Sequence, residues 1–133
     1  MFLLKPNLSE LCSLTGHNTI EATVLEAAAR QLIDKNYCEI AVVSLGPQGA
    51  MLVSRQEQIM VNAPIVKKVS TVGAGDSMVA GMTWMLDQQR PLAEVLQFGV
   101  ACGTAATMNP GTALFKKRDA LRLFEQLSRQ KSA

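Results

Sequence analysis

Residues 40–43 constrain the fold of this chain more than any other segment. They read Ile-Ala-Val-Val, a β-branched run without polar alternation, which is typical of a strand buried on both faces of a parallel sheet. The run ends in Ser44-Leu45-Gly46, so a loop is expected directly after it. Because such a sheet needs helices to cover it, the chain should be an α/β protein.

The residues before this strand predict another strand and a helix. Phe2-Leu3-Leu4 has the character of the end of a buried strand, and the following Pro6 and Asn7 favour a turn and then a helix start. Leucines at positions 8, 11 and 14 continue at helical spacing until Gly16. We therefore expect a helix between residues 8 and 15.

A second helix and a pair of strands lie on either side of residues 40–46 in the predicted order. Glu21 follows Asn18-Thr19 at a spacing suited to a capping box, and apolar residues then recur every three or four positions from 24 to 33. Residues 50–54 and 58–62 predict two further strands joined by the polar turn at 55–57. We expect these two strands to form a hairpin at one edge of the sheet.

The C-terminal half is predicted to be helical. Residues 77–86 and 92–108 are rich in Ala, Met, Leu and Val, and Asn109-Pro110-Gly111 should end the second of these helices. Leu121, Phe124 and Leu127 mark a last amphipathic helix. The expected fold is a three-layer α/β/α sandwich with a mainly parallel sheet. At 133 residues and 14.4 kDa, residues 1–133 should form a single domain or a large part of one.

Composition argues against several classes of partner. A net charge of +2 is far below the positive field expected of a protein that binds nucleic acid or an anionic membrane. The longest apolar stretches are too short to span a membrane. The spacing of Cys12, Cys38 and Cys102 matches neither a zinc site nor a disulfide framework. We therefore expect free, partly buried thiols in a reducing cytoplasm, and no nucleic-acid or membrane partner.

A small, glycine-rich segment at residues 70–77 carries the strongest functional signal. It leads directly into the predicted helix of residues 77–86, so the amides of Gly73, Ala74 and Gly75 would face a ligand from a helix N-terminus, where phosphate is favoured. Asp76 is the only carboxylate between Glu57 and Asp87. An acid beside a phosphate site repels the ligand, unless it takes a proton from an attacking hydroxyl. The alternative is that Asp76 caps the helix and the glycines make a tight turn.

A second glycine loop follows the strand of residues 40–45. Gly46-Pro47-Gln48-Gly49 lies where a strand ends, which is where open α/β sheets bind ligands. The chain contains no Gly-Lys dipeptide, which excludes a conventional P-loop.

These motifs resemble those of the ribokinase-like PfkB carbohydrate kinases. The segment from Thr71 to Gly81 is similar to that family's C-terminal motif, residues 5–10 to its Asn-x-x-Glu magnesium motif, and residues 43–49 to its nucleotide loop. The three occur in the family's order. Residues 98–107 and 109–112 resemble the phosphofructokinase branch, the minor or type 2 enzymes. The resemblance covers essentially the whole chain but only the C-terminal half of the family's fold.

The resemblance implies a kinase that transfers phosphate from ATP to a sugar or a sugar phosphate. Asp76 would be the base, and the amides of Gly73, Ala74 and Gly75 would hold the phosphoryl group. Glu10 and Asn7 would hold Mg²⁺. On their own these two residues are better explained as a first-turn glutamate and a helix cap, and it is the other motifs that favour the metal.

The nucleotide and potassium sites are also implied by the resemblance alone. Ser44, Gly46 and Gly49 would line the nucleotide loop, with Val100 and Thr104 over the adenine, although core packing is the alternative for this helix and is preferred for Gly99 and Gly103. Lys68 would approach the nucleotide or, equally well, form a solvated pair with Lys67. Members of this branch bind K⁺ through backbone carbonyls, and the matching positions are Ser70, Val72, Ala106, Asn109, Gly111 and Ala113.

The family's N-terminal half has no counterpart in this sequence, and two function classes therefore remain. The chain is the active part of a sugar kinase, or it is a non-catalytic nucleotide-binding or assembly fragment of one. In both cases an exposed sheet edge and helix face would favour pairing with another chain, and a homo-oligomer is expected.

Overall fold

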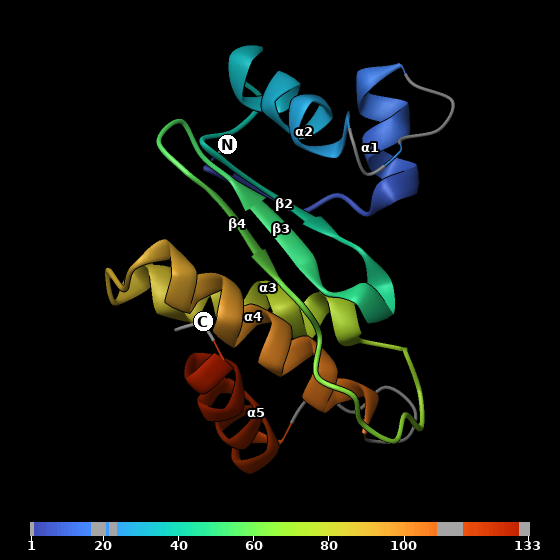
Figure 1. The fold of residues 1–133 in the computed structure, drawn as a ribbon, viewed down its shortest axis with the longest axis vertical. Coiled ribbons are helices and arrows are strands. Elements are labelled where there is room, and N and C mark those ends of the chain that lie inside the picture. Colours follow the sequence, from blue (N-terminus) through green and yellow to red (C-terminus); the bar gives the residue numbers. More distant parts are fainter. Residues whose placement is uncertain (1, 17–20, 22–23, 109–115, 131–133) are drawn as a thin grey trace. The chain divides into compact units, whose positions relative to one another are not determined.

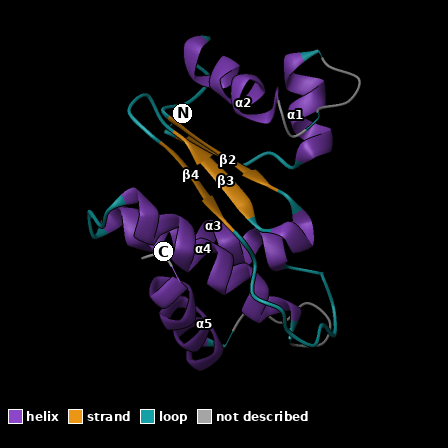
Figure 2. Cartoon of the chain, in the orientation of Figure 1, coloured by secondary structure: helices purple, strands orange, loops and turns teal. Residues whose placement is uncertain are grey.

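The computed structural model describes residues 2–16, 21, 24–108 and 116–130 (Figure 1). The chain forms two compact units, residues 1–60 and 61–133. The first unit combines strands with two α-helices, and helices make up most of the second (Figure 2), so the predicted α/β class is confirmed.

The sheet contains four strands among the described residues. In spatial order they are β1 (Leu3–Leu4), β2 (Ile40–Ser44), β3 (Ala50–Val53) and β4 (Gln58–Val61). Strand β1 pairs with β2 in parallel, with Leu3 opposite Ile40, and β2 pairs with β3 in antiparallel orientation, with Val42 opposite Leu52. The sheet of this chain is thus mixed rather than mainly parallel, because the predicted edge strands of residues 50–61 return directly beside β2.

Helices α1 (Leu8–Thr15) and α2 (Leu25–Asp34) pack on this sheet and enclose the core of the first unit. Leu11, Leu32 and Ile33 are almost completely buried, and they belong to one apolar cluster with the strand residues Ala41 and Val43. Each such side chain contributes about 1.5–3 kcal/mol by leaving water. The neighbouring β2 residues are buried too, as predicted for the Ile-Ala-Val-Val run.

The ends of these helices only partly follow the sequence pattern. Helix α1 ends at Gly16, which has the left-handed φ of +79° and donates its amide to the Cys12 carbonyl at 2.9 Å. Helix α2 begins later than predicted, at Leu25, and its cap residue Val24 makes no side-chain hydrogen bond. The Asn18 and Thr19 of the predicted capping box lie outside the described residues.

The second unit consists of helices α3 (Ala74–Asp87), α4 (Leu92–Thr107) and α5 (Lys117–Gln130). Phe98 of α4 joins the three, because its ring lies 5.5 Å from that of Trp84 on α3 and 5.4 Å from that of Phe124 on α5. The buried stripe of α5 is Ala120, Leu123 and Leu127, whereas Leu121, which the sequence suggested for this stripe, is exposed. Among the described residues, no helix is long and apolar enough to cross a membrane.

The three cysteines are free, as predicted. Cys38 and Cys102 are buried and Cys12 is half-buried. Burial raises the pKa of the Cys38 thiol and raises the pKa of Cys102 to about 12.

Alkylation of the native protein should therefore distinguish these thiols. At pH 8 a group with a pKa of about 12 is ionised in roughly one molecule in ten thousand, so Cys102 should resist iodoacetamide while Cys12 reacts. Peptide mass spectrometry after a timed reaction measures the difference in alkylation. In about 6 M guanidinium chloride, which unfolds the protein, all three thiols should react alike. Equal rates for Cys12 and Cys102 in the native protein would show that the α3–α4 interface is open.

Candidate functional site

The first unit brings three of the predicted site residues to the ends of two parallel strands. Asn7, just after β1, forms an isolated parallel bridge with Ser44, the last residue of β2. The Ser44 amide donates to the Pro6 carbonyl at 3.0 Å. Since Asn7 also caps α1, the strand end, the cap and Glu10 in the first turn of the helix lie together.

Asn7 and Glu10 form a complete capping box. The Asn7 side-chain oxygen accepts from the Glu10 amide at 2.8 Å, and the Glu10 oxygen Oε1 accepts from the Asn7 amide at 2.9 Å. The structural role that the sequence left open for these residues is therefore realised. Among the described residues nothing donates to the other glutamate oxygen, Oε2, and both side chains are exposed.

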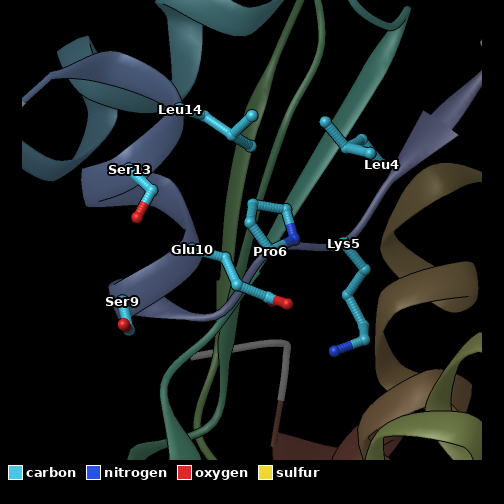
Figure 3. A pocket seen from close by; sticks show the side chains of 7 residues that line it. All are labelled: Leu4, Lys5, Pro6, Ser9, Glu10, Ser13 and Leu14. Carbon is cyan, nitrogen blue, oxygen red and sulfur yellow. The ribbon is translucent and has the colours of Figure 1, made fainter.

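A groove of about 380 Å³ lies beside this capping box. Figure 3 shows the side chains of Lys5 and Glu10 on either side of Pro6. Leu4, Ser9, Ser13 and Leu14 complete the lining. The groove thus offers one cation, one carboxylate and two hydroxyls over an apolar wall.

The donor set fits a largely hydrated magnesium ion. Within the described parts of the chain, no three His, Cys, Asp or Glu residues gather into a metal-binding group. One free carboxylate oxygen on Glu10 and the amide oxygen of Asn7 supply at most two ligands, and Mg²⁺ commonly keeps several waters when a protein offers one or two oxygens.

The 46–49 loop is a tight turn that depends on its two glycines. Residues Gly46–Gln48 form a single 3₁₀ turn, in which the Gly49 amide donates to the Gly46 carbonyl at 3.1 Å, and the Leu45 amide joins the ends of the loop by donating to the Gly49 carbonyl at 2.8 Å. Gly46 and Gly49 have φ of +61° and +109°, which residues with a side chain rarely adopt. The predicted loop is confirmed as a structure, while its contact with a nucleotide stays a prediction.

In the second unit, helix α3 begins with Gly73 as its cap residue. Gly73 has a φ of +84°, and no side chain hydrogen-bonds to this cap. Asp76 is the third residue of the helix and is exposed. The alternative in which Asp76 caps the helix is therefore wrong, and residues 73–76 are not packed into the interior.

The free amides of this turn differ in part from those predicted. The Ala74 amide is directed at the Thr71 carbonyl at 3.3 Å, and the helical ladder begins with Ser77 donating to Gly73 at 2.9 Å. The amides of Gly73, Gly75 and Asp76 have no acceptor among the described residues. Sequence reasoning missed the Asp76 amide, although any residue in the first turn of a helix has a free N–H group.

The segment before this turn is tied to the end of α4. The Thr107 carbonyl accepts from the amides of Val69 and Ser70, at 2.6 and 3.1 Å, and the Val72 amide donates to the Ser70 hydroxyl at 3.1 Å. Ser70 and Ala106 are both predicted potassium ligands. Ser70 is therefore hydrogen-bonded to Thr107, the residue directly after Ala106. Asn109, Gly111 and Ala113 lie outside the described residues.

The remaining predicted nucleotide contacts differ in accessibility. Lys68 is exposed, whereas Val100 and Thr104 are 5% and 7% exposed. The side chains of these two α4 residues are therefore mainly part of the packed interior. The same holds for Gly99 and Gly103, where an added Cβ would contact Met82 and the Ala74 carbonyl oxygen respectively, which confirms the packing role preferred for these glycines.

Ser77 is a feature of this site that sequence reasoning did not single out. Its hydroxyl is fully buried directly after Asp76 and has no hydrogen-bond partner among the described residues. A buried hydroxyl without a partner is costly, and only the structure could show that this serine faces inward.

A family model described as pfkB family carbohydrate kinase matches residues 1–118. The ATP-dependent 6-phosphofructokinase isozyme 2 of Escherichia coli is 43% identical over 127 residues, which are 96% of this chain and 41% of that protein. The 1-phosphofructokinase of Vibrio cholerae is 32% identical over 95% of this chain and 39% of that protein. The chain thus spans about two fifths of the length of these relatives.

Solved structures show the same similarity. Escherichia coli phosphofructokinase-2 in complex with potassium gives a TM-score of 0.93 at 43% identity, over 97% of this chain and 42% of that one. Its tetrameric inhibited form gives 0.87 at 40% identity, over 97% and 41%. Arabidopsis thaliana ribokinase, complexed with ribose and ATP, gives 0.84 at 25% identity, over 94% and 41%. The predicted ribokinase-like fold and the resemblance to type 2 phosphofructokinases are confirmed.

Replacing Ser77 with alanine should not destabilise the protein. The substitution removes an unpaired buried hydroxyl, and we expect the free energy of unfolding to rise by about 1 kcal/mol in a urea titration. Ser13→Ala, at an exposed position of α1, controls for the helix propensity of alanine. A loss of about 1 kcal/mol or more relative to this control would show that the hydroxyl has a partner.

The capping role of Asn7 can be separated from metal binding by working in EDTA. Asn7→Ala should lower the free energy of unfolding by about 1 kcal/mol, since the Glu10 amide loses its acceptor. Asn7→Asp keeps an acceptor oxygen and should remain within about 0.5 kcal/mol of the wild type. If the alanine variant is as stable as the aspartate variant, the capping box contributes nothing.

Proposed function

Because this chain belongs to the pfkB family of carbohydrate kinases, we propose that it is the nucleotide-binding and catalytic part of an ATP-dependent kinase. The acceptor would be a hydroxyl group of a sugar phosphate, as in the phosphofructokinases to which the chain is similar. The two units, residues 1–60 and 61–133, would act as one domain in this reaction.

The observation that carries the proposal is the start of helix α3. There an exposed carboxylate, that of Asp76, adjoins backbone amides that have no acceptor among the described residues. Phosphoryl transfer asks a protein mainly to place a nucleophile in line and to stabilise charge on the phosphoryl oxygens. A free helix N-terminus with an adjacent base has both capacities.

In the proposed reaction the Asp76 carboxylate takes the proton of the acceptor hydroxyl. The hydroxyl oxygen forms a bond to the γ-phosphorus of ATP, and the bond from that phosphorus to the β–γ bridging oxygen breaks, which releases ADP. The amides of Gly73, Gly75 and Asp76 would stabilise the equatorial oxygens during this step. Because Asp76 is exposed, it can return the proton to water.

Two ions would support this chemistry. Glu10 and Asn7 would hold Mg²⁺, partly through water, and the ion would neutralise charge on the ATP phosphates. The carbonyls of Ser70, Val72 and Ala106, with those of Asn109, Gly111 and Ala113, would hold K⁺. The negative end of the α4 dipole at Thr107 favours a cation there, and the Escherichia coli relative was solved with potassium.

The nucleotide would bind to the tight turn after β2. Ser44, Gly46 and Gly49 would line it, and Lys68 would approach the phosphates. Since Val100 and Thr104 are nearly buried, contact with the adenine would use only the small exposed part of each side chain. ATP binding is supported by the ribokinase structure, which contains ATP.

A second candidate function is a non-catalytic role. The alternative is a nucleotide-binding or assembly fragment of such a kinase, and the chain spans about two fifths of the relatives it matches. We propose a homo-oligomer in either case, because Val79 and Trp84 are exposed apolar residues on α3 and because a relative has a tetrameric form.

Turnover of Asp76→Asn tests the proposed function. ADP production is measured with fructose 6-phosphate, tagatose 6-phosphate and fructose 1-phosphate, and the variant should lose about 10²- to 10⁴-fold in kcat. Asp87→Asn, an exposed carboxylate at the other end of α3, is the matched control and should keep the wild-type rate.

Unchanged turnover in Asp76→Asn would rule out the base assignment. Binding of ATP–Mg²⁺ by the wild type without any turnover would instead support the fragment alternative.

A further inference from the structure

Three glycines allow helices α3 and α4 to approach each other closely. A Cβ built on Gly81 of α3 would lie 2.6 Å from the Cys102 sulfur, and one built on Gly99 of α4 would collide with the Met82 side chain. A Cβ on Gly103 of α4 would lie 3.2 Å from the Ala74 carbonyl oxygen and 3.4 Å from the Met78 Cβ. Any side chain at these positions must therefore displace something on the facing helix.

Gly103 differs from the other two glycines in the part of α3 that its added Cβ would meet. A Cβ on Gly81 would be nearest to the sulfur and Cβ of Cys102 on α4, at 2.6 and 3.1 Å, and one on Gly99 would be nearest to the Met82 side chain of α3, with the Met78 carbonyl oxygen at 3.4 Å. The nearest atom to Gly103 is a backbone oxygen of Ala74, the first residue of α3. Backbone can move only with the turn to which it belongs, and that turn contains Gly75 and Asp76.

Backbone strain does not explain the glycine at position 103. Its φ is not in the left-handed region, and alanine is a better helix former than glycine. The close approach to Ala74 is therefore the feature of the structure that favours a residue without a side chain at this position.

The same stretch of α4 also holds the segment that enters the turn. Four residues after Gly103, the Thr107 carbonyl accepts from the amides of Val69 and Ser70. Residues 103–107 thus contact the chain on both sides of the 71–73 loop. They accept hydrogen bonds from Val69 and Ser70 before the loop, and they pack against the Ala74 backbone after it.

We infer that Gly103 is a positioning residue for the proposed anion-binding turn, residues 73–76. Gly103 sets the distance between α4 and Ala74, and this distance fixes the position of the Gly75 and Asp76 amides. This inference deepens the proposed function and rests on it for its catalytic meaning. Its structural content, that residue 103 fixes the geometry of residues 73–76, is independent of catalysis.

Alanine scanning of the three glycines tests the inference in the chain as it is. Amide ¹H–¹⁵N spectra are recorded without ligand, thermal unfolding is followed, and the dissociation constant for ATP–Mg²⁺ is measured by calorimetry. Gly103→Ala should shift the resonances of residues 73–76 and weaken ATP–Mg²⁺ binding about tenfold, since misplacement by a fraction of an ångström already impairs a preorganised site. Gly81→Ala and Gly99→Ala should lower the unfolding temperature and leave those resonances and the dissociation constant near their wild-type values.

Spectra of Gly103→Ala that match the wild type at residues 73–76 would overturn the inference, as would equal perturbation of this turn by all three variants. If the turn shifts only in Gly103→Ala while the wild type binds no ATP–Mg²⁺, the positioning role stands and the proposed function fails.

Hydrogen exchange in the wild type gives a second test that needs no variant. The amides of Val69, Ser70 and Ser77 should open together with those of residues 103–107. Exchange of Val69 and Ser70 that is independent of α4 would contradict the inference, whether or not Gly103→Ala folds.

Discussion

A helix that begins with a left-handed glycine leaves its first amides without a side-chain partner. In this chain Gly73 has that conformation, and the consequence is a turn with free N–H groups beside an exposed carboxylate, Asp76. A serine or asparagine at position 73 would have satisfied one of these amides and would have weakened the site for an anion. The phosphate binding proposed for the second unit thus depends on the absence of a side-chain cap.

The first unit uses the opposite arrangement. Its helix α1 is fully capped, because Asn7 and Glu10 satisfy each other's amides, and the same two residues are those proposed to hold magnesium. The cap fixes both side chains at the end of β1, and it leaves Glu10 Oε2 available among the described residues. Structural and ligand-binding roles are therefore compatible here, since a mostly hydrated Mg²⁺ needs few protein oxygens.

The sequence predicted the elements well because apolar spacing and glycines determine them locally. The strand at 40–44, the edge strands that follow and the long helices α3 and α4 follow from such patterns. What it could not predict depends on the folded backbone and on packing: that the Ala74 amide is directed at the Thr71 carbonyl, that Ser77 faces inward, and that Leu121 is exposed. The functional motifs, by contrast, were identified by family resemblance, because an isolated Gly-x-Gly-Asp could equally be a simple turn.

The proposed function depends above all on binding of the phosphoryl group by backbone amides at the start of α3. Scalar couplings across hydrogen bonds, measured between ³¹P of a non-hydrolysable ATP analogue with Mg²⁺ and ¹⁵N of the backbone amides, test it most directly. We expect couplings from the γ-phosphate to the Gly75 and Asp76 amides. A bound analogue whose γ-phosphate couples only to amides elsewhere, with those of residues 73–76 unperturbed, would contradict it.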